Sequence, residues 1–138
     1  MKIFIDANLF IYLNTITDNT IRLIYENFYF NILKKYKAYT DVLVLDELIY
    51  VSRKKYKIPY RISLSFIESS ILPYVNILKL GEDEYIEAAK ILSDYNVKPS
   101  DALHLGAIKR NNIMFIASED SEYDKIDWVK RIWLTHLM

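Results

Sequence analysis

The chain has 138 residues, of which 52% are hydrophobic, so it is long enough and apolar enough for one domain with a buried core. Its 18 basic and 18 acidic side chains cancel, so any binding of nucleic acid must depend on a local patch rather than on the overall field. The absence of cysteine excludes disulfides, thiolate zinc sites and cysteine nucleophiles, and it agrees with residence in the cytoplasm.

Apolar periodicity, turn residues and charges divide the chain into alternating strands and helices. In chain order we expect a strand at 2–6, a short helix at 7–14, a helix at 19–37, a strand at 37–40, a helix from 41 to about 55, a helix at 59–71, a strand at 74–80, a helix at 82–94, a helix at 101–111, a strand at 113–117, a turn or short helix at 121–125 and an edge strand at 128–134. No apolar run reaches the ~20 residues of a membrane-spanning helix. We therefore expect one soluble, unprocessed domain over residues 1–138 that does not enter a membrane.

Single residues mark where several of these helices begin. Asp41 is expected to cap the helix that follows it, although the run VLVL at 42–45 alone also suits a strand. Pro59 suits the start of a helix. Pro99 requires an extended residue before it, and Ser100 is then expected to cap the next helix.

The helix after Asp41 is apolar on nearly all sides. Every position from 42 to 51 is apolar except Asp46 and Glu47, so we expect this helix to be buried on most of its surface. The helical neighbours of Glu47 would then be apolar, which is a poor environment for an unpaired carboxylate.

Strands that alternate with helices predict an α/β fold, a three-layer α/β/α sandwich around a central parallel sheet, because parallel neighbours need crossover connections. Ligands bind such sheets at the carboxyl ends of the strands. Asp6 ends the first predicted strand, and Asp120 lies just beyond the strand at 113–117. Asp101, in the first turn of its helix, and Glu47 can join them at this edge.

All four of these acids border apolar segments, where a carboxylate loses hydration. Two unit charges about 4 Å apart, at an effective dielectric constant near 20, repel by about 4 kcal/mol, so a cluster of ionised carboxylates needs a proton or a cation. A hard divalent cation such as Mg²⁺ offsets several carboxylates at once, and its bound waters are acidic enough to supply a nucleophile for phosphodiester hydrolysis. The acids therefore predict a metal-dependent site with one or two ions.

Each acid also has a purely structural interpretation. Asp6 suits the cap of the following helix, Asp101 suits the dipole of its helix, and Asp120 suits a turn. Glu47 could instead form a buried salt bridge with an arginine or lysine, and Asp46 competes with it for a role in the site.

Several other side chains have two interpretations. His104 lies in the helix predicted from 101, where a packed or solvent-facing histidine is more common than a catalytic base. A basic cluster of Arg53, Lys54, Lys55 and Lys57 suits either contacts with RNA phosphates or a solvated helix end. The twelve tyrosines suit either the rim of the core or base stacking and interface contacts.

Four stretches of the chain resemble the PIN domain family and, within it, the small VapC-type toxins of prokaryotic toxin–antitoxin pairs. They are IFIDANLFIYL, VLDELIYV, SDALHLGAI and FIASEDSEYDKI, and their order and spacing agree with the family. Together they span the chain, although the resemblance says little about residues 127–138.

This resemblance implies an α/β/α fold that binds Mg²⁺ or Mn²⁺ and cleaves RNA endonucleolytically. By position, Asp6, Glu47 and Asp101 match the acids held responsible for metal binding in the family. Asp120 matches the fourth acid, which is more variable.

The resemblance also implies supporting residues and partners. Asn8 and Ser118 match the polar neighbours of the first and last acids, and Asp124 is a second candidate for the fourth acid. A homodimer and silencing by a small antitoxin are implied in the same way.

Other classes of protein fit less well. With only Gly81 and Gly106 in the chain, no glycine-rich phosphate loop can form, which excludes kinases, P-loop NTPases and Rossmann oxidoreductases. A phosphatase with an aspartyl nucleophile needs a second acid where Asn8 stands. The stronger alternative is a PIN-like domain that binds RNA or a protein without cleaving anything. We expect the metal-dependent endoribonuclease, cleaving single-stranded or loop regions.

Overall fold

Five parallel strands form the centre of the protein, in a computed structural model that describes residues 1–134. The strands are β1 (Lys2–Ile5), β2 (Lys37–Asp41), β3 (Asn76–Leu78), β4 (Phe115–Ala117) and β5 (Lys130–Ile132). They lie in the order β3-β2-β1-β4-β5, and every pairing is parallel. In the central strand β1, Ile3, Phe4 and Ile5 are fully buried, as expected for a strand that is covered on both faces.

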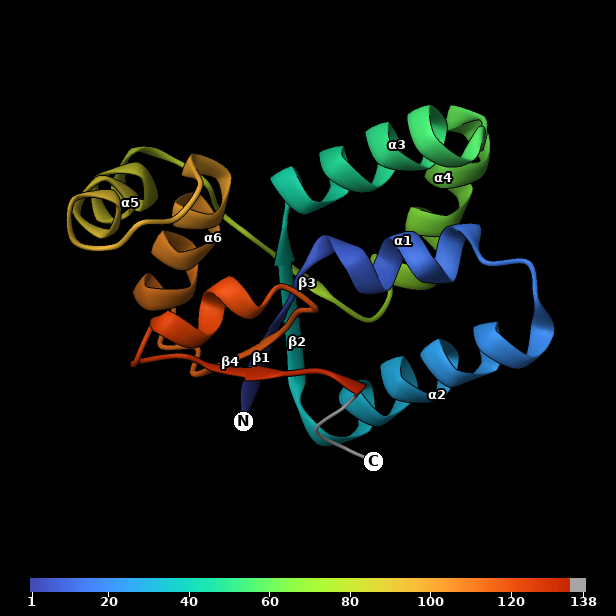
Figure 1. The fold of residues 1–138 in the computed structure, drawn as a ribbon, viewed down its shortest axis with the longest axis horizontal. Coiled ribbons are helices and arrows are strands. Elements are labelled where there is room, and N and C mark those ends of the chain that lie inside the picture. The colour runs from blue at the N-terminus through green and yellow to red at the C-terminus, as the bar shows by residue number, and fades with distance from the viewer. Residues whose placement is uncertain (135–138) are drawn as a thin grey trace.

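Helices cover the two faces of this sheet (Figure 1). They are α1 (Ala7–Thr15), α2 (Asn19–Lys35), α3 (Val42–Tyr56), α4 (Tyr60–Phe66), α5 (Glu82–Asp94) and α6 (Pro99–Arg110), with a π-helical turn η1 (Ile67–Ile71) and a 3₁₀ turn η2 (Ser121–Lys125). α5 and α6 pack together on one side of the sheet, and α1 to α4 lie on the other. The predicted three-layer α/β/α sandwich with a central parallel sheet is confirmed.

Three strands are shorter than predicted. β3, β4 and β5 have three residues each, against the expected 74–80, 113–117 and 128–134, because each pairs with its neighbour over only three positions. The predicted helix at 59–71 consists of α4 followed by η1. The last four residues of the predicted domain, 135–138, lie outside the described part of the chain.

The two predicted N-caps differ in outcome. Asp41 caps α3 as expected, since its Oδ1 accepts a hydrogen bond of 3.1 Å from the backbone N–H of Val44. The prediction that Ser100 caps α6 is wrong, because the helix begins at Pro99 and Lys98 occupies the cap position. Proline has a fixed φ and no N–H, which suits the first helical position, so the helix begins before Ser100.

The expectation that α3 is buried on most sides is also wrong. Its buried residues are Val44, Leu48 and Ser52, which follow one another at four-residue spacing along a single stripe. Val42 and Tyr50 are each 54% exposed. α3 packs against α1 and α4 at the rim of the molecule rather than between two layers, so its other faces meet solvent (Figure 1).

The crossing of α5 and α6 depends on Gly106. A Cβ atom at this position would lie 2.6 Å from the backbone oxygen of Glu84 and 3.1 Å from the backbone nitrogen of Ala88. Only glycine permits this approach of the two helices, because both neighbouring atoms belong to backbone. The contact fixes α6, which carries Asp101 and His104, against α5.

Candidate functional site

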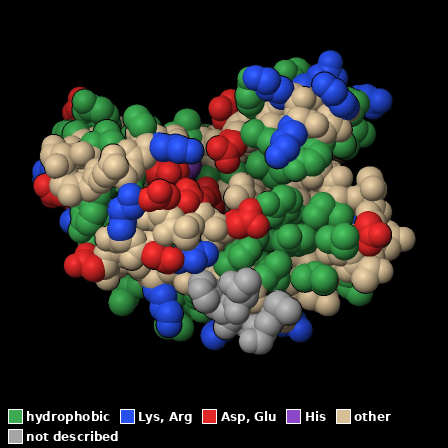
Figure 2. All heavy atoms as spheres, in the orientation of Figure 1, with side chains coloured by type: hydrophobic (Ala, Val, Ile, Leu, Met, Phe, Trp, Pro, Cys, Tyr) green, Lys and Arg blue, Asp and Glu red, His purple; other side chains and the backbone are tan. Residues whose placement is uncertain are grey.

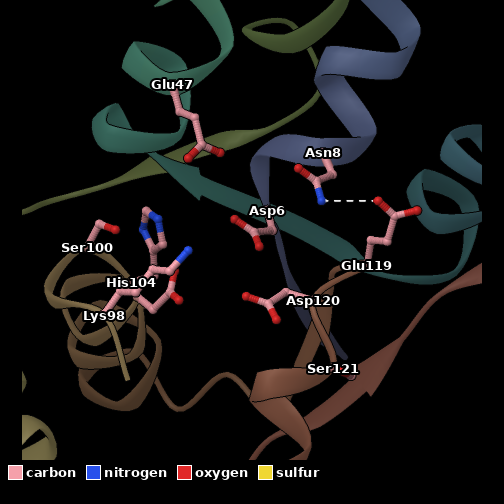
Figure 3. Close-up of a pocket in the computed structure, with 10 residues that line it drawn as sticks. Asp6, Asn8, Glu47, Lys98, Ser100, His104, Glu119, Asp120 and Ser121 are labelled. Atoms are coloured by element: carbon pink, nitrogen blue, oxygen red, sulfur yellow. Dashed lines mark hydrogen bonds between the residues drawn. The ribbon is translucent and has the colours of Figure 1, made fainter. Parts of the chain in front are cut away.

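A cavity of about 470 Å³, here called the acidic pocket, opens at the carboxyl ends of β1 and β4, between α3 and α6 (Figure 3). It is lined by Asp6, Asn8, Glu47, Lys98, Ser100, Asp101, His104, Glu119, Asp120 and Ser121. All four acids predicted from the sequence are among these residues. Figure 2 shows acidic side chains gathered in the hollow between the two groups of helices.

Asp6 is held in place at the end of β1. Its Oδ1 accepts a hydrogen bond of 2.9 Å from the backbone N–H of Ala7, so it caps α1, and its Oδ2 accepts one of 2.7 Å from the hydroxyl of Ser118. The same hydroxyl oxygen accepts the backbone N–H of Asp120 at 3.1 Å. Buried Ser118 therefore connects the first and the fourth predicted acid, and Asp6 serves as a cap while its carboxylate lines the pocket.

Asp101 lies in the first turn of α6 and is oriented by Tyr123. The phenol of Tyr123, which is buried in η2, donates a hydrogen bond of 3.0 Å to Oδ1 of Asp101. Burial raises the pKa of Asp101, and the charges of Asp6 and Asp120 add to the rise, while the Tyr123 hydrogen bond and His104 oppose it. The second oxygen of Asp101 accepts no hydrogen bond from the described residues.

Glu47 extends from α3 into the same pocket (Figure 3). The residue as a whole is exposed, but its carboxyl group faces the hollow, where partial loss of water raises its pKa. The charge of Asp6 raises that pKa further, whereas His104 and Lys98 act against it. The pocket thus carries more negative charge than its two cations balance.

A buried pair beneath the pocket was not predicted. Nδ1 of His104 lies 2.6 Å from Oδ2 of Asp41, and both side chains are almost fully buried. Burial alone would lower the pKa of His104, but the hydrogen bond to Asp41 and its charge outweigh that effect and raise the pKa. No local pattern connects positions 41 and 104, so the sequence gives no signal for this contact.

Four further lining residues had no predicted role in the site: Lys98, Ser100, Glu119 and Ser121. Glu119 accepts hydrogen bonds from the side-chain amide of Asn8 and from the hydroxyl of Tyr12. Glu119 stands between Ser118 and Asp120, both of which are predicted site residues, and this position could have indicated its place in the pocket. Asn8 itself lies at the edge of the pocket, as a supporting residue would.

Two sets of predicted residues lie outside the acidic pocket. Asp124, the second candidate for the fourth acid, forms hydrogen bonds of 2.9 and 3.1 Å with Arg131. The basic cluster lies at the end of α3, where Arg53, Lys54 and Lys57 line a separate cavity and Lys55 contacts the Tyr56 ring.

The acidic pocket suits a divalent cation that keeps part of its hydration shell. Within residues 1–134, no three Asp, Glu or His side chains lie close enough together to hold a metal ion between them. Mg²⁺, however, keeps several waters and takes only one or two carboxylates directly. Burial raises the pKa of Glu47 and of Asp101, and the charges of neighbouring carboxylates add to the rise; a hydrated cation would relieve this repulsion between carboxylates. The donor set therefore fits a hydrated Mg²⁺ or Mn²⁺ rather than a fully dehydrated ion.

Comparison with known proteins identifies the family. The profile described as PIN domain matches residues 3–129. The chain belongs to the PIN domain family. None of the curated proteins matches this PIN domain significantly. No helix within residues 1–134 combines the length and apolar character required to cross a membrane.

Solved structures share the fold of this PIN domain at low sequence identity. VapBC2 from Rickettsia felis, bound to a promoter DNA fragment, matches with a TM-score of 0.72 and 16% identity over 96% of this chain and 98% of that chain. VapC20 from Mycobacterium tuberculosis, described as a Sarcin-Ricin loop cleaving toxin, matches with a TM-score of 0.72 and 14% identity over 93% and 97%. DNA-bound VapBC from Salmonella typhimurium matches with a TM-score of 0.71 and 18% identity over 97% and 98%.

Proposed function

We propose that this PIN domain is a metal-dependent endoribonuclease that hydrolyses RNA phosphodiester bonds, and that it is the toxin of a VapBC-type toxin–antitoxin pair. The proposal is carried by one observation, that four acids from separate chain segments line the same pocket: Asp6, Glu47, Asp101 and Asp120. Structural roles for the individual acids would not require them to meet.

In this proposal the four acids hold Mg²⁺ or Mn²⁺. When bound, the ion makes its coordinated water more acidic and offsets negative charge on the phosphodiester. The protein's own contribution is to fix the acids beforehand. The N–H of Ala7 and the hydroxyl of Ser118 hold the two oxygens of Asp6, and Tyr123 holds one oxygen of Asp101, so both carboxylates are positioned before an ion binds.

Lys98 is assigned to the phosphate of the substrate. Its exposed side chain lines the acidic pocket, and within the described residues it forms no ion pair with any of the carboxylates. An ammonium group at this rim can contact a phosphate oxygen and lower the repulsion between the RNA backbone and the acids. The pocket thereby admits an anion despite its own negative charge.

The partners of the protein follow from the same proposal. Structures that share its fold are named as DNA-bound VapBC assemblies or as a toxin–antitoxin complex, which supports a small antitoxin as partner; a homodimer is part of the same proposal. VapC20, which shares the fold, is named as a Sarcin-Ricin loop cleaving toxin, and this supports single-stranded or loop regions as the substrate of this chain. The reaction would take place in the cytoplasm.

Cleavage of a fluorescent single-stranded RNA by the purified protein tests the proposal. We expect cleavage with Mg²⁺ or Mn²⁺, none with EDTA, and a loss of at least a hundredfold in Asp101→Asn. Asp124→Asn is the matched control, because it removes an acid just outside the pocket. If Asp124→Asn is inactive while Asp120→Asn is active, Asp124 rather than Asp120 is the fourth acid of the site. Full activity of Asp101→Asn would reject the proposal.

A PIN-like module that binds without cleaving is the second candidate, favoured by the absence of a close metal cluster within residues 1–134. Thermal melting with Mn²⁺ and with EDTA separates the two, because an ion that binds the native state raises its melting temperature. An unchanged melting temperature, together with RNA binding and no cleavage, would favour this candidate.

A further inference from the structure

A second cavity, of about 450 Å³, lies where α3 ends and α4 begins, and we call it the basic groove. Its lining consists of three cationic and two aromatic side chains: Tyr50, Arg53, Lys54, Lys57 and Tyr60. None of the three cations forms an ion pair with any residue between 1 and 134. The groove therefore presents uncompensated positive charge in a chain whose net charge is zero.

The tyrosines of the groove are each covered on one side by a cation. The Arg53 guanidinium lies 5.5 Å from the centre of the Tyr60 ring, and the Lys54 ammonium lies 5.4 Å from that of Tyr50, to whose hydroxyl it donates a hydrogen bond of 3.0 Å. Both tyrosines are nevertheless 54% exposed. These contacts hold the rings in place and leave aromatic surface free for a planar ligand.

The groove lies on the same face of α3 as Glu47. Glu47, Tyr50 and Lys54 follow one another at spacings of three and four residues, which places them along one side of α3, and Lys57 lies just beyond the end of the helix. At about 1.5 Å per residue, Lys54 lies roughly 10 Å along the helix axis from Glu47. Figure 2 shows Lys and Arg side chains over this end of the molecule, next to the acidic hollow.

A helix dipole explains basic residues at the end of α3, but it does not explain the cavity or its two exposed tyrosines. Lysine and arginine contacts to phosphates, combined with aromatic rings that stack on bases, are how proteins bind single-stranded nucleic acid. The 10 Å between Glu47 and Lys54 corresponds to about three stacked nucleotides at roughly 3.4 Å each.

We propose that the basic groove binds the segment of single-stranded RNA adjacent to the bond cleaved in the acidic pocket, with Arg53, Lys54 and Lys57 on phosphates and Tyr50 and Tyr60 on a base. This inference rests on the proposed function, and it names the path of the substrate. The strand would follow α3 from the groove to Glu47.

The test is fluorescence anisotropy with a labelled ten-nucleotide oligouridine in EDTA, so that binding is measured apart from cleavage. We expect Lys54→Glu combined with Lys57→Glu to weaken binding at least tenfold. Replacing both by Gln should lower the slope of log K against log salt by about 1.4, because each phosphate contact to a single strand contributes ~0.7. Tyr50→Leu and Tyr60→Leu should each weaken binding about fivefold or more.

The matched control is Lys34→Glu combined with Lys35→Glu. These lysines end α2 as Lys54 and Lys57 end α3, and Lys35 also lies over a tyrosine ring, that of Tyr36, at 5.6 Å. The control makes the same charge change at a distant helix end. It should bind the oligouridine like the original protein, and circular dichroism should show all variants folded.

The possible outcomes separate the two proposals. Unchanged affinity in the groove variants, with RNA cleavage intact, would overturn the groove and leave the nuclease. Equal weakening of RNA binding in the Lys34/Lys35 control would also overturn the proposal for the groove. Groove variants that keep their RNA affinity but lose binding of a labelled ten-residue glutamate peptide would overturn it as well, and would indicate a protein partner. Selective weakening without any metal-dependent cleavage would support the groove and reject the nuclease.

Discussion

Nδ1 of His104 lies 2.6 Å from Oδ2 of Asp41, which joins α6 to the start of α3 underneath the acidic pocket. Asp41 at the same time caps α3 through its other oxygen, which accepts the N–H of Val44. The two helices that contribute Glu47 and Asp101 are thus connected by one buried carboxylate. The pair has consequences for stability that can be measured.

The stability of the protein should depend on the protonation of His104. Its pKa in the folded protein is raised above its ordinary value of 6.5, so the native state binds this proton more tightly than the unfolded chain does. The stabilisation is fully present below about pH 6.5 and is lost as the pH rises through the raised folded pKa. Denaturant unfolding between pH 6 and 9 should show this decline, and His104→Asn should remove it. A wild-type decline that persists unchanged in His104→Asn would contradict the assignment.

Asp101→Asn should stabilise the metal-free protein. The raised pKa of Asp101 means that its ionised form is disfavoured in the folded state, and asparagine can still accept the hydrogen bond from Tyr123. We expect the melting temperature in EDTA to rise by about 3 °C, which corresponds to ~1 kcal/mol for a domain of this size. The rise in melting temperature that we expect Mn²⁺ to cause in the parent protein should be absent in Asp101→Asn.

Asp124→Asn is the control for that experiment. It weakens the two hydrogen bonds to Arg131, so it should lower the melting temperature slightly while the response to Mn²⁺ is retained. A Mn²⁺ response that survives Asp101→Asn would mean that the ion binds elsewhere.

Ser118→Ala should weaken metal binding although Ser118 is not itself among the proposed ligands. Its hydroxyl holds Oδ2 of Asp6 at 2.7 Å and accepts the backbone N–H of Asp120, so its loss removes one hydrogen bond from each of two of the four acids. Loss of a residue that orients a metal ligand typically costs about 10–100-fold in metal affinity or activity. A Mn²⁺ titration of RNA cleavage measures this, with Ser93→Ala at an exposed position of α5 as the control. Equal Mn²⁺ requirements in both variants would count against the role of Ser118.

Gly106→Ala should destabilise the protein by about 1–3 kcal/mol, the usual cost of forcing an extra carbon into a packed contact. The added methyl group would meet the backbone of Glu84 and Ala88, which cannot move independently. Gly81→Ala is the matched control, since its nearest neighbour is the flexible side chain of Lys79. Urea denaturation compares the two variants, and equal effects would show that the helix crossing tolerates a side chain.

The sequence predicted the parts of the site that follow from strand ends. Asp6 comes directly after an apolar run and Asp120 follows another by three residues, and the carboxyl ends of parallel strands share one edge, so their meeting could be foreseen. The contact between Asp41 and His104 could not be predicted, because it joins positions 63 residues apart and depends on how α6 packs. Local signals identified the cap but not the second bond.

The misplaced expectations have related causes. The apolar composition of α3 does not determine how many of its faces pack against other elements. Only one stripe of the helix is buried, while Val42 and Tyr50 are exposed. The residue type of Ser100 favours a cap, whereas the preceding proline moves the start of α6. In both helices tertiary packing or a neighbouring residue outweighs the local preference.

The strand order has a consequence for the synthesis of the protein. β1 is made first but its second neighbour, β4, is made near the end, and only then does the backbone N–H of Asp6 find the carbonyl of Ala117. A polypeptide released by a stalled ribosome before residue 115 would have an open edge along Ile3–Ile5 and would lack Asp120. We expect such a fragment to fold poorly, and it would lack one of the four acids on which the proposed nuclease activity depends.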